Sequence, residues 1–399
     1  MRKFLTTLLL AAALCSAASA FAAAPFHIGI CTETVSQAED NLRGAEELIR
    51  RYGDVADGGY IKHITIPDNF MTEMETTISQ IASFADDPQM KVVVVVTAVP
   101  GTTEAFRRIR ERRPDILLFA GRPQEDPGVI ESASDLVVDV DNISRGYLLI
   151  YAAKELGATD FVHISFPRHM SSEIILRRAR IMEETCKDLG LKYHFETAPD
   201  PLSDVGVAGA QQYILEHVST WLDRYGTKTG FYCTNDAHTE PLLKRIVELG
   251  GIFIESGSPL CGYPGALGLD LSNAAGDFPA ILKSIETEVL RRGAAGRIGA
   301  WTYSAGFVTV AALAEYGKQC VERHVAPASF RRHFAPKDLF RIYKANTSGA
   351  SWNGSFYRDA QTGLEKKNHL MVYQDTYVFG KGYMGVTDLV IPEKYFSIK

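Results

Sequence analysis

The chain has 399 residues, of which 46% are hydrophobic and 23% are charged, and its formal net charge is −6. This composition is typical of a globular protein long enough for two domains. The excess of acidic residues argues against nucleic acid as a partner, because the phosphate backbone repels a negative surface. No run beyond the amino terminus has the roughly 18 consecutive apolar residues of a membrane helix, so we expect the mature chain to span no membrane.

The first 22 residues are predicted to be a secretory signal peptide and not part of the fold. A basic start is followed by an apolar run to Cys15, and Ala18-Ser19-Ala20 fits the small-residue cleavage pattern. A lipid-modified cysteine would follow a small residue, whereas Leu14 precedes Cys15, so the sequence disfavours a lipoprotein. The mature protein is therefore expected in the periplasm.

From Phe26 onward, short apolar runs alternate with longer stretches of helical periodicity. Strands are predicted at 26–31, 60–66, 91–96, 115–121, 135–141, 160–166, 192–198, 229–234, 251–256 and 265–271. Helices are predicted at 36–52, 70–85, 102–112, 143–156, 170–189, 207–225, 237–249, 278–292 and 304–322. This alternation predicts an α/β fold of two Rossmann-like lobes, each with a parallel sheet flanked by helices.

The run "KVVVVV" at 91–96 indicates where the sheet is most buried. Five consecutive valines leave no polar face, which is typical of a central parallel strand covered by helices on both sides. A short polar loop and a helix follow at once. In open parallel sheets, ligands bind outside the carboxyl ends of the strands, beside helix N-termini. Two series of such loops predict two sheets whose carboxyl ends face each other across a cleft.

The candidate ligand-binding residues all lie in loops or helix starts that follow predicted strands. Those of the first half are Thr32, Glu33, Ser36, Thr97, Thr102 and Arg122, and those of the second half are Phe166, Arg168, His169, Asn235 and Asp236. Each has a structural alternative: the hydroxyl residues can form turns, one of Asn235 and Asp236 can cap a helix, and Phe166 can pack in the core. Arg145 is placed where the chain first crosses between lobes, where it can pair the lobes or contact a ligand.

The sequence contains no motif typical of a catalytic, metal-binding or cofactor-binding site. The histidines of the second half are not spaced i, i+4, and there is no G-x-S-x-G, H-E-x-x-H or Walker pattern. We therefore predict no enzyme, no metal and no cofactor. Five cysteines remain after residue 22, with no C-x-x-C pair, which leaves room for one disulfide, with Cys261 as a candidate, but indicates no disulfide framework.

Three segments carry a resemblance to a known family. They are "HIGICTETVSQAEDNLRGAEELIRRYG" from His27, "VDVDNISRGYLLIYAAKELGATDFVHIS" from Val138, and "FYCTNDAHTEPLLKRIVELG" from Phe231. In their order and spacing they resemble the opening strand and loop, the first crossover and the asparagine-aspartate helix start of type I periplasmic substrate-binding proteins. The resemblance covers roughly residues 26–325. It departs from the family at "GYPGALGLDLSN", where a glycine-rich aspartate loop is altered, and in a tail that begins near Asn346.

The resemblance implies a multi-strand hinge and function by closure of the two lobes around a small molecule. We expect lobe 1 at 25–142 and about 300–345, lobe 2 at 143–299, and a C-terminal extension at 346–399. The implied partner is the permease of an ABC importer, and the implied ligand is a sugar or nucleoside-like compound, with an amino acid or other small acid second. We expect the protein to be a monomer. The alternatives are a periplasmic ligand sensor for a membrane receptor and, in another class, a secreted α/β hydrolase.

Overall fold

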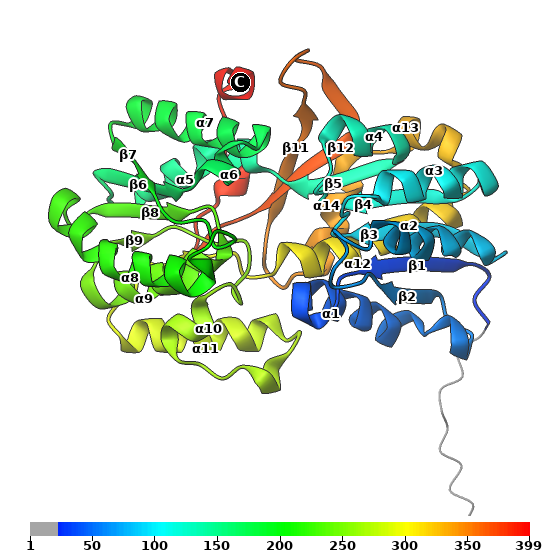
Figure 1. The fold of residues 1–399 in the computed structure, drawn as a ribbon, viewed down its shortest axis with the longest axis horizontal. Coiled ribbons are helices and arrows are strands. Elements are labelled where there is room, and N and C mark those ends of the chain that lie inside the picture. The colour runs from blue at the N-terminus through cyan, green and yellow to red at the C-terminus, as the bar shows by residue number, and fades with distance from the viewer. Residues whose placement is uncertain (1–22) are drawn as a thin grey trace, which may run out of the picture.

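The computed structural model describes residues 23–399, which form two α/β lobes side by side (Figure 1). Each lobe is built on its own sheet with helices on both faces, as the sequence predicts. The predicted signal peptide and Cys15 lie outside the described residues. Within the described part, no helix is long and apolar enough to cross a membrane.

The first lobe contains a seven-stranded sheet in the order β11-β12-β5-β4-β3-β1-β2. Its strands run parallel except for β11, which is antiparallel to β12. They are β1 (His27–Thr32), β2 (Ile61–Thr65), β3 (Met90–Val96), β4 (Leu117–Gly121), β5 (Leu136–Val140), β11 (Trp352–Arg358) and β12 (Glu365–Gln374). The polar loops that follow β1, β3, β4 and β5 therefore lie at one edge.

Helices cover both faces of this sheet. One face packs against α1 (Val35–Tyr52), α12 (Ala305–Glu322) and α14 (Pro336–Ala345), with the short α13 (Phe330–His333) beside them. The other packs against α2 (Met74–Ala82), α3 (Thr102–Arg112) and α4 (Pro127–Ala133).

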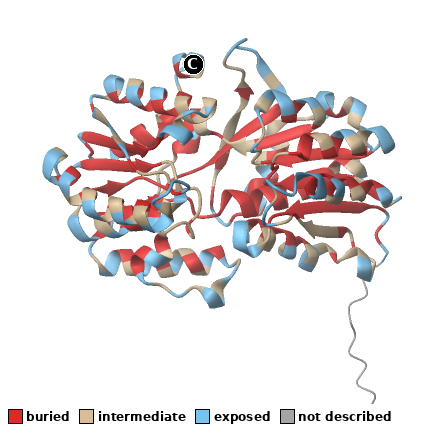
Figure 2. Ribbon diagram, in the orientation of Figure 1, coloured by how far each residue is buried: buried red, intermediate tan, exposed pale blue. Residues whose placement is uncertain are grey.

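The valine run confirms the prediction of a central strand. Strand β3 lies between β4 and β1, and all five valines are at most 1% exposed (Figure 2). Val92, Val94 and Val96 belong to the core on the α12 side, whereas Val93 and Val95 belong to the core on the α2 and α3 side. Because successive side chains of a strand point to opposite faces, only a sheet covered on both sides buries all five.

The second lobe contains a four-stranded parallel sheet in the order β7-β6-β8-β9. Helices α5 and α7 pack on one face, and α8 and α9 on the other. The strands are β6 (Asp160–Ser165), β7 (Lys192–Thr197), β8 (Thr229–Cys233) and β9 (Ile252–Phe253). The helices are α5 (Asn142–Glu155), α6 (Pro167–Met170), α7 (Glu173–Leu189), α8 (Gly206–Tyr225), α9 (Asp236–Leu249), α10 (Tyr263–Leu267) and α11 (Phe278–Arg291).

The strand predicted at 265–271 is wrong, because this segment forms the short helix α10 and the loop after it. Gly262 and Gly268 bound α10 with φ of 78° and 69°, which favour a turn at each end. Pro264 stands at the helix start, where its missing N–H is not needed. A short apolar run does not distinguish a strand from a buried helix by its pattern alone.

Three crossings join the lobes: from β5 to α5, from β10 (Gly299–Ala300) to α12, and from β12 to β13 (Tyr377–Val378). Strands β10, β13 and β14 (Gly382–Tyr383) form a small sheet of their own. We call the side chains that join the crossings the hinge cluster: Arg145, Glu255, Trp301 and Thr376. The buried carboxylate of Glu255 accepts hydrogen bonds from Arg145 Nε (2.9 Å), Trp301 Nε1 (3.0 Å) and Thr376 Oγ1 (2.6 Å). One carboxylate thus ties all three crossings together.

The C-terminal extension belongs to both lobes. Residues 352–374 supply the last two strands of the first sheet, and the chain then crosses to the second lobe, where it ends beside α7 (Figure 1). Arg177 Nε on α7 donates to the carbonyl oxygen of Ile398 at 2.9 Å. The five cysteines of the described residues are free, so no disulfide involving Cys261 is formed in this structure.

Candidate functional site

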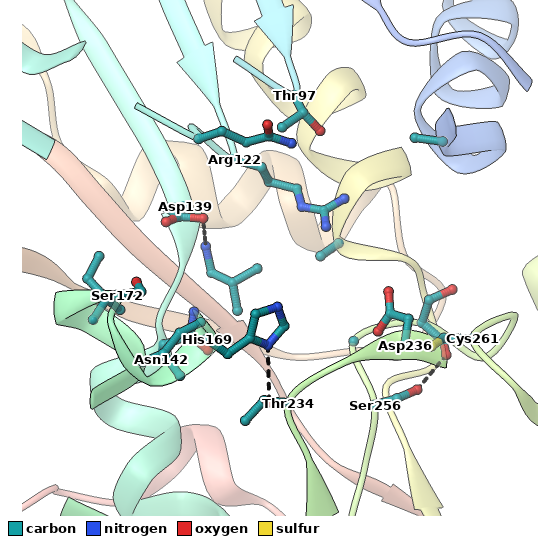
Figure 3. Close-up of a pocket in the computed structure, with 18 of the residues that line it drawn as sticks. Thr97, Arg122, Asp139, Asn142, His169, Ser172, Thr234, Asp236, Ser256 and Cys261 are labelled. Atoms are coloured by element: carbon teal, nitrogen blue, oxygen red, sulfur yellow. Dashed lines mark hydrogen bonds between the residues drawn. The ribbon is translucent and has the colours of Figure 1, made fainter. Parts of the chain in front are cut away.

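A cleft of about 1300 Å³ opens between the carboxyl ends of the two sheets. Loops and helix starts after β1, β3, β4 and β5 line it from the first lobe, and those after β6, β8 and β9 line it from the second (Figure 3). The two facing loop series that the sequence predicts are therefore present.

A hydrogen-bonded triad of Glu33, Asn41 and Thr97 forms part of the first-lobe wall. Glu33 Oε2 accepts from Asn41 Nδ2 at 2.7 Å and from Thr97 Oγ1 at 3.0 Å, which fixes the three side chains against one another. Within residues 23–399, Oδ1 of the fully buried Asn41 accepts no hydrogen bond. Buried polar atoms are normally paired, so this oxygen is an acceptor that the protein itself does not use.

Arg122, Asp40 and Asp139 add charge to the same wall. Arg122 has a φ of 48°, a left-handed conformation that is uncommon for a residue with a side chain and that often marks functional loops. Burial raises the pKa of the Asp40 carboxyl and of the Asp139 carboxyl. Asp40 Oδ2 also accepts a hydrogen bond of 3.1 Å from Ser258 Oγ of the second lobe, so the two lobes touch across the cleft.

His169 is the central polar side chain of the second-lobe wall. Its Nδ1 lies 3.1 Å from Thr234 Oγ1 (Figure 3). Thr234 Oγ1 in turn lies 2.8 Å from Ser165 Oγ. The ring of Phe166 packs against the imidazole with centroids 4.1 Å apart. Burial, helped by the charge of Arg168, lowers the pKa of His169 to about 4. The imidazole is therefore neutral at pH 7, with one nitrogen to donate and one to accept.

Asn235 and Asp236, at the start of α9, have different roles: one caps the helix and the other lines the cleft. Asn235 Oδ1 accepts from the backbone N–H of Ala237 at 2.9 Å and caps α9, whereas Asp236 lines the cleft beside Cys261 (Figure 3). Capping satisfies one of the free amides of the helix. Asp236, in the first turn of the same helix, is left to face the cleft.

The structure brings five of the eleven predicted residues together at the cleft: Glu33, Thr97, Arg122, His169 and Asp236. The other six do not line it: Thr32, Ser36, Thr102, Phe166, Arg168 and Asn235.

Local hydrogen bonds or packing explain these six positions. Thr32 Oγ1 is buried against His63 Nε2 at 2.9 Å, and Thr102 Oγ1 donates to the carbonyl oxygen of Val99 at 2.7 Å. Ser36 is exposed and bonds Thr34. Arg168 turns outward to pair with both oxygens of Asp200, at 2.6 and 2.8 Å. Those contacts lower the pKa of Asp200 to about 2.

Other cleft residues are not predictable from strand ends, because they lie inside helices or strands and not in the loops that follow strands. Asp40 and Asn41 are more than one turn inside α1, and Arg178 is more than one turn inside α7. Asp139 had a usable signal, because it is a carboxylate near the carboxyl end of an otherwise apolar strand. Arg145, left open between two roles, pairs with Glu255 in the hinge cluster and also lines the cleft.

Comparisons with known proteins identify the family. Residues 26–299 match the model of a family described as "Protein of unknown function (DUF3798)". The chain belongs to this family. A second family model matches residues 310–398. Two proteins of Treponema pallidum (strain Nichols), each described as "Uncharacterized protein", are similar to this chain. One is 40% identical over 187 residues (47% of this chain, 86% of the relative), and the other is 42% identical over 178 residues (44% and 80%).

Solved structures place the fold of this DUF3798 protein among the type I periplasmic binding proteins. A sugar ABC transporter protein from Actinomyces odontolyticus ATCC 17982 matches with a TM-score of 0.53 at 8% identity, over 92% of this chain and 98% of the other. A second match is a protein from Clostridium difficile 630, and the name of its crystal structure describes it as a transcriptional regulator. This match has a TM-score of 0.78 at 21% identity and covers 89% of this chain and 99% of the other. At these identities the likeness concerns the fold.

Proposed function

We propose that this protein is an exported solute-binding protein that closes its two lobes around a small polar ligand and delivers it to an ABC importer. The observation that carries the proposal is the cleft itself. Polar side chains from both lobes line it, and the three crossings beneath it can act as a hinge. Hinge closure about a ligand is the common mode of action of this architecture.

The polar wall favours a ligand with several hydrogen-bonding groups, such as a sugar or nucleoside-like compound. Asp236, His169 and Thr97 offer acceptors and donors at separate points of the cleft. A few well-placed polar groups of this kind give a binding site its specificity. The fold similarity to a sugar ABC transporter protein points the same way. Delivery to a membrane receptor instead of a permease would use the same closure.

A thermal-shift screen of sugars, nucleosides, amino acids and small acids tests the proposal. A ligand at about 100 times its Kd should stabilise the folded protein by about 2.7 kcal/mol. Asp236→Ala should abolish the shift, whereas Asp223→Ala, which removes an exposed carboxylate of α8 in the same lobe, should keep it. If no compound raises the unfolding temperature, or if a bound compound is recovered chemically changed, the proposal fails.

A further inference from the structure

Arg178 on α7 is a buried cation that reaches the cleft. It is only 4% exposed and lines the cavity. Its Nη1 donates to Asn142 Oδ1, and this is the one hydrogen bond that the guanidinium makes within residues 23–399. Its Nε is buried and has no acceptor among those residues. A guanidinium has five N–H donors, so most of its capacity is unused.

Among residues 23–399, no carboxylate forms an ion pair with Arg178. Arg145, the neighbouring cation, forms an ion pair with Glu255, and the carboxylate of Glu173 on α7 pairs with Arg177 instead. His163 and His169 are neutral at pH 7, because burial and the charge of Arg178 both hold their pKa values low. The guanidinium carbon of Arg178 lies 4.9 Å from the ring centre of Tyr232, a contact that offsets only part of the lost hydration.

An unpaired buried charge destabilises a protein by several kcal/mol and is retained where something else pairs with it. Other buried arginines of this chain follow that rule: Arg145 pairs with Glu255, and Arg177 pairs with Glu173 and backbone carbonyls. In contrast, Arg178 faces the cleft, where a bound molecule can supply the missing anion.

We propose that the ligand carries a carboxylate that pairs with Arg178, and that its remaining donor groups face the carboxylates of Asp40, Asp139 and Asp236. This inference rests on the proposed function and narrows it to a small acid with hydroxyl or ammonium donors, which is the chemistry shared by a sugar acid and an amino acid. A neutral sugar or nucleoside would leave the guanidinium unpaired in the closed cleft, at a cost to affinity.

The test uses the purified full chain and matched pairs of probes: galacturonate with galactose, gluconate with sorbitol, and amino acids with their amides. Binding is followed by thermal shift and calorimetry in wild type, Arg178→Met and Arg178→Lys. The control is Arg168→Met, which removes an arginine of the same lobe that does not line the cleft. We expect an acid to bind wild type and its neutral partner not to bind. Arg178→Met should weaken binding by at least about 30-fold, Arg178→Lys should restore part of it, and Arg168→Met should leave it unchanged.

A second readout judges Arg178 without any ligand. Because methionine removes an uncompensated buried charge, Arg178→Met should raise the unfolding midpoint of the ligand-free protein, whereas Arg168→Met should not raise it. A lower midpoint for Arg178→Met would show a structural role and overturn the inference. Equal binding of a neutral probe to wild type and Arg178→Met would also overturn it while leaving the proposed function intact. Binding of no probe at all would count against the proposed function, and a phosphate-bearing compound that binds in place of every carboxylate would refute the assignment of a carboxylate.

Discussion

Replacing Glu255 with glutamine should lower the free energy of unfolding, because Glu255 holds together the three crossings that the hinge cluster joins. Glu255 is 4% exposed, and its ion pair with Arg145 is buried on both sides, with side-chain exposures of 7% for Arg145 and 4% for Glu255. Removing one partner of such a pair leaves a buried charge without compensation, which costs about 3–5 kcal/mol. The glutamine NH₂ group is a donor, so it would face one of the three donors that now bond to the Glu255 carboxylate, and that hydrogen bond would be lost.

Urea unfolding followed by circular dichroism measures this loss directly. Glu47→Gln is the control, because Glu47 pairs with Arg50 and Arg51 on the surface of α1, where an ion pair contributes at most about 1 kcal/mol. Adding Arg145→Met to Glu255→Gln should recover much of the loss, since the double variant leaves neither member of this ion pair as a charge without its partner. A loss for Glu255→Gln no larger than that of the control would refute the role given to the hinge cluster.

Three further predictions concern the core, the cleft and the extension. His163 is fully buried and its pKa is lowered to about 3, below the roughly 6.5 of an unfolded chain. The unfolded state therefore takes up the proton first as pH falls, so stability decreases by about 1.4 kcal/mol between pH 7.5 and 5.5. His163→Gln should flatten the pH dependence of the unfolding free energy by that amount, and an unchanged slope would contradict it. Gly306→Ala would place a methyl group 1.9 Å from Asn41 Oδ1 and 2.8 Å from Arg122 Nη1. It should cost about 1–3 kcal/mol in urea unfolding, against almost no loss for Gly257→Ala, which meets nothing within 4 Å. Deleting residues 346–399 should give an insoluble chain, because it uncovers the edge of β5 and removes the third crossing; a soluble truncated protein with wild-type circular dichroism would show that the extension is dispensable.

The alternation of apolar runs and helical stretches was sufficient to predict both lobes. Strong local signals placed most elements, such as the valine run of β3 and the asparagine that caps α9. The pattern failed at 265–271, where the apolar residues of α10 are buried between α9 and α11. A run this short is too brief for its periodicity to distinguish a buried helix from a strand. It also gave no pairing for the extension, because a strand's neighbours depend on contacts far apart in sequence, such as β12 with β5.

The candidate site was predictable only at the level of its loops. A rule based on strand ends found Glu33 and Asp236, but it also selected Thr102, whose hydroxyl is consumed by the turn before its own helix. Whether a side chain near a strand end faces the cleft depends on the hydrogen bonds it makes locally. Arg178 could not be found this way, because it lies inside α7 and not in a loop that follows a strand.

Native mass spectrometry of the purified full chain, followed by denaturing release of anything bound, tests the central claim most directly. Our account predicts a single small molecule, bound in a one-to-one ratio, chemically unchanged on release and absent from Asp236→Ala. A protein that carries no small molecule and gains none from a metabolite extract, or one that releases a reaction product, would contradict the account.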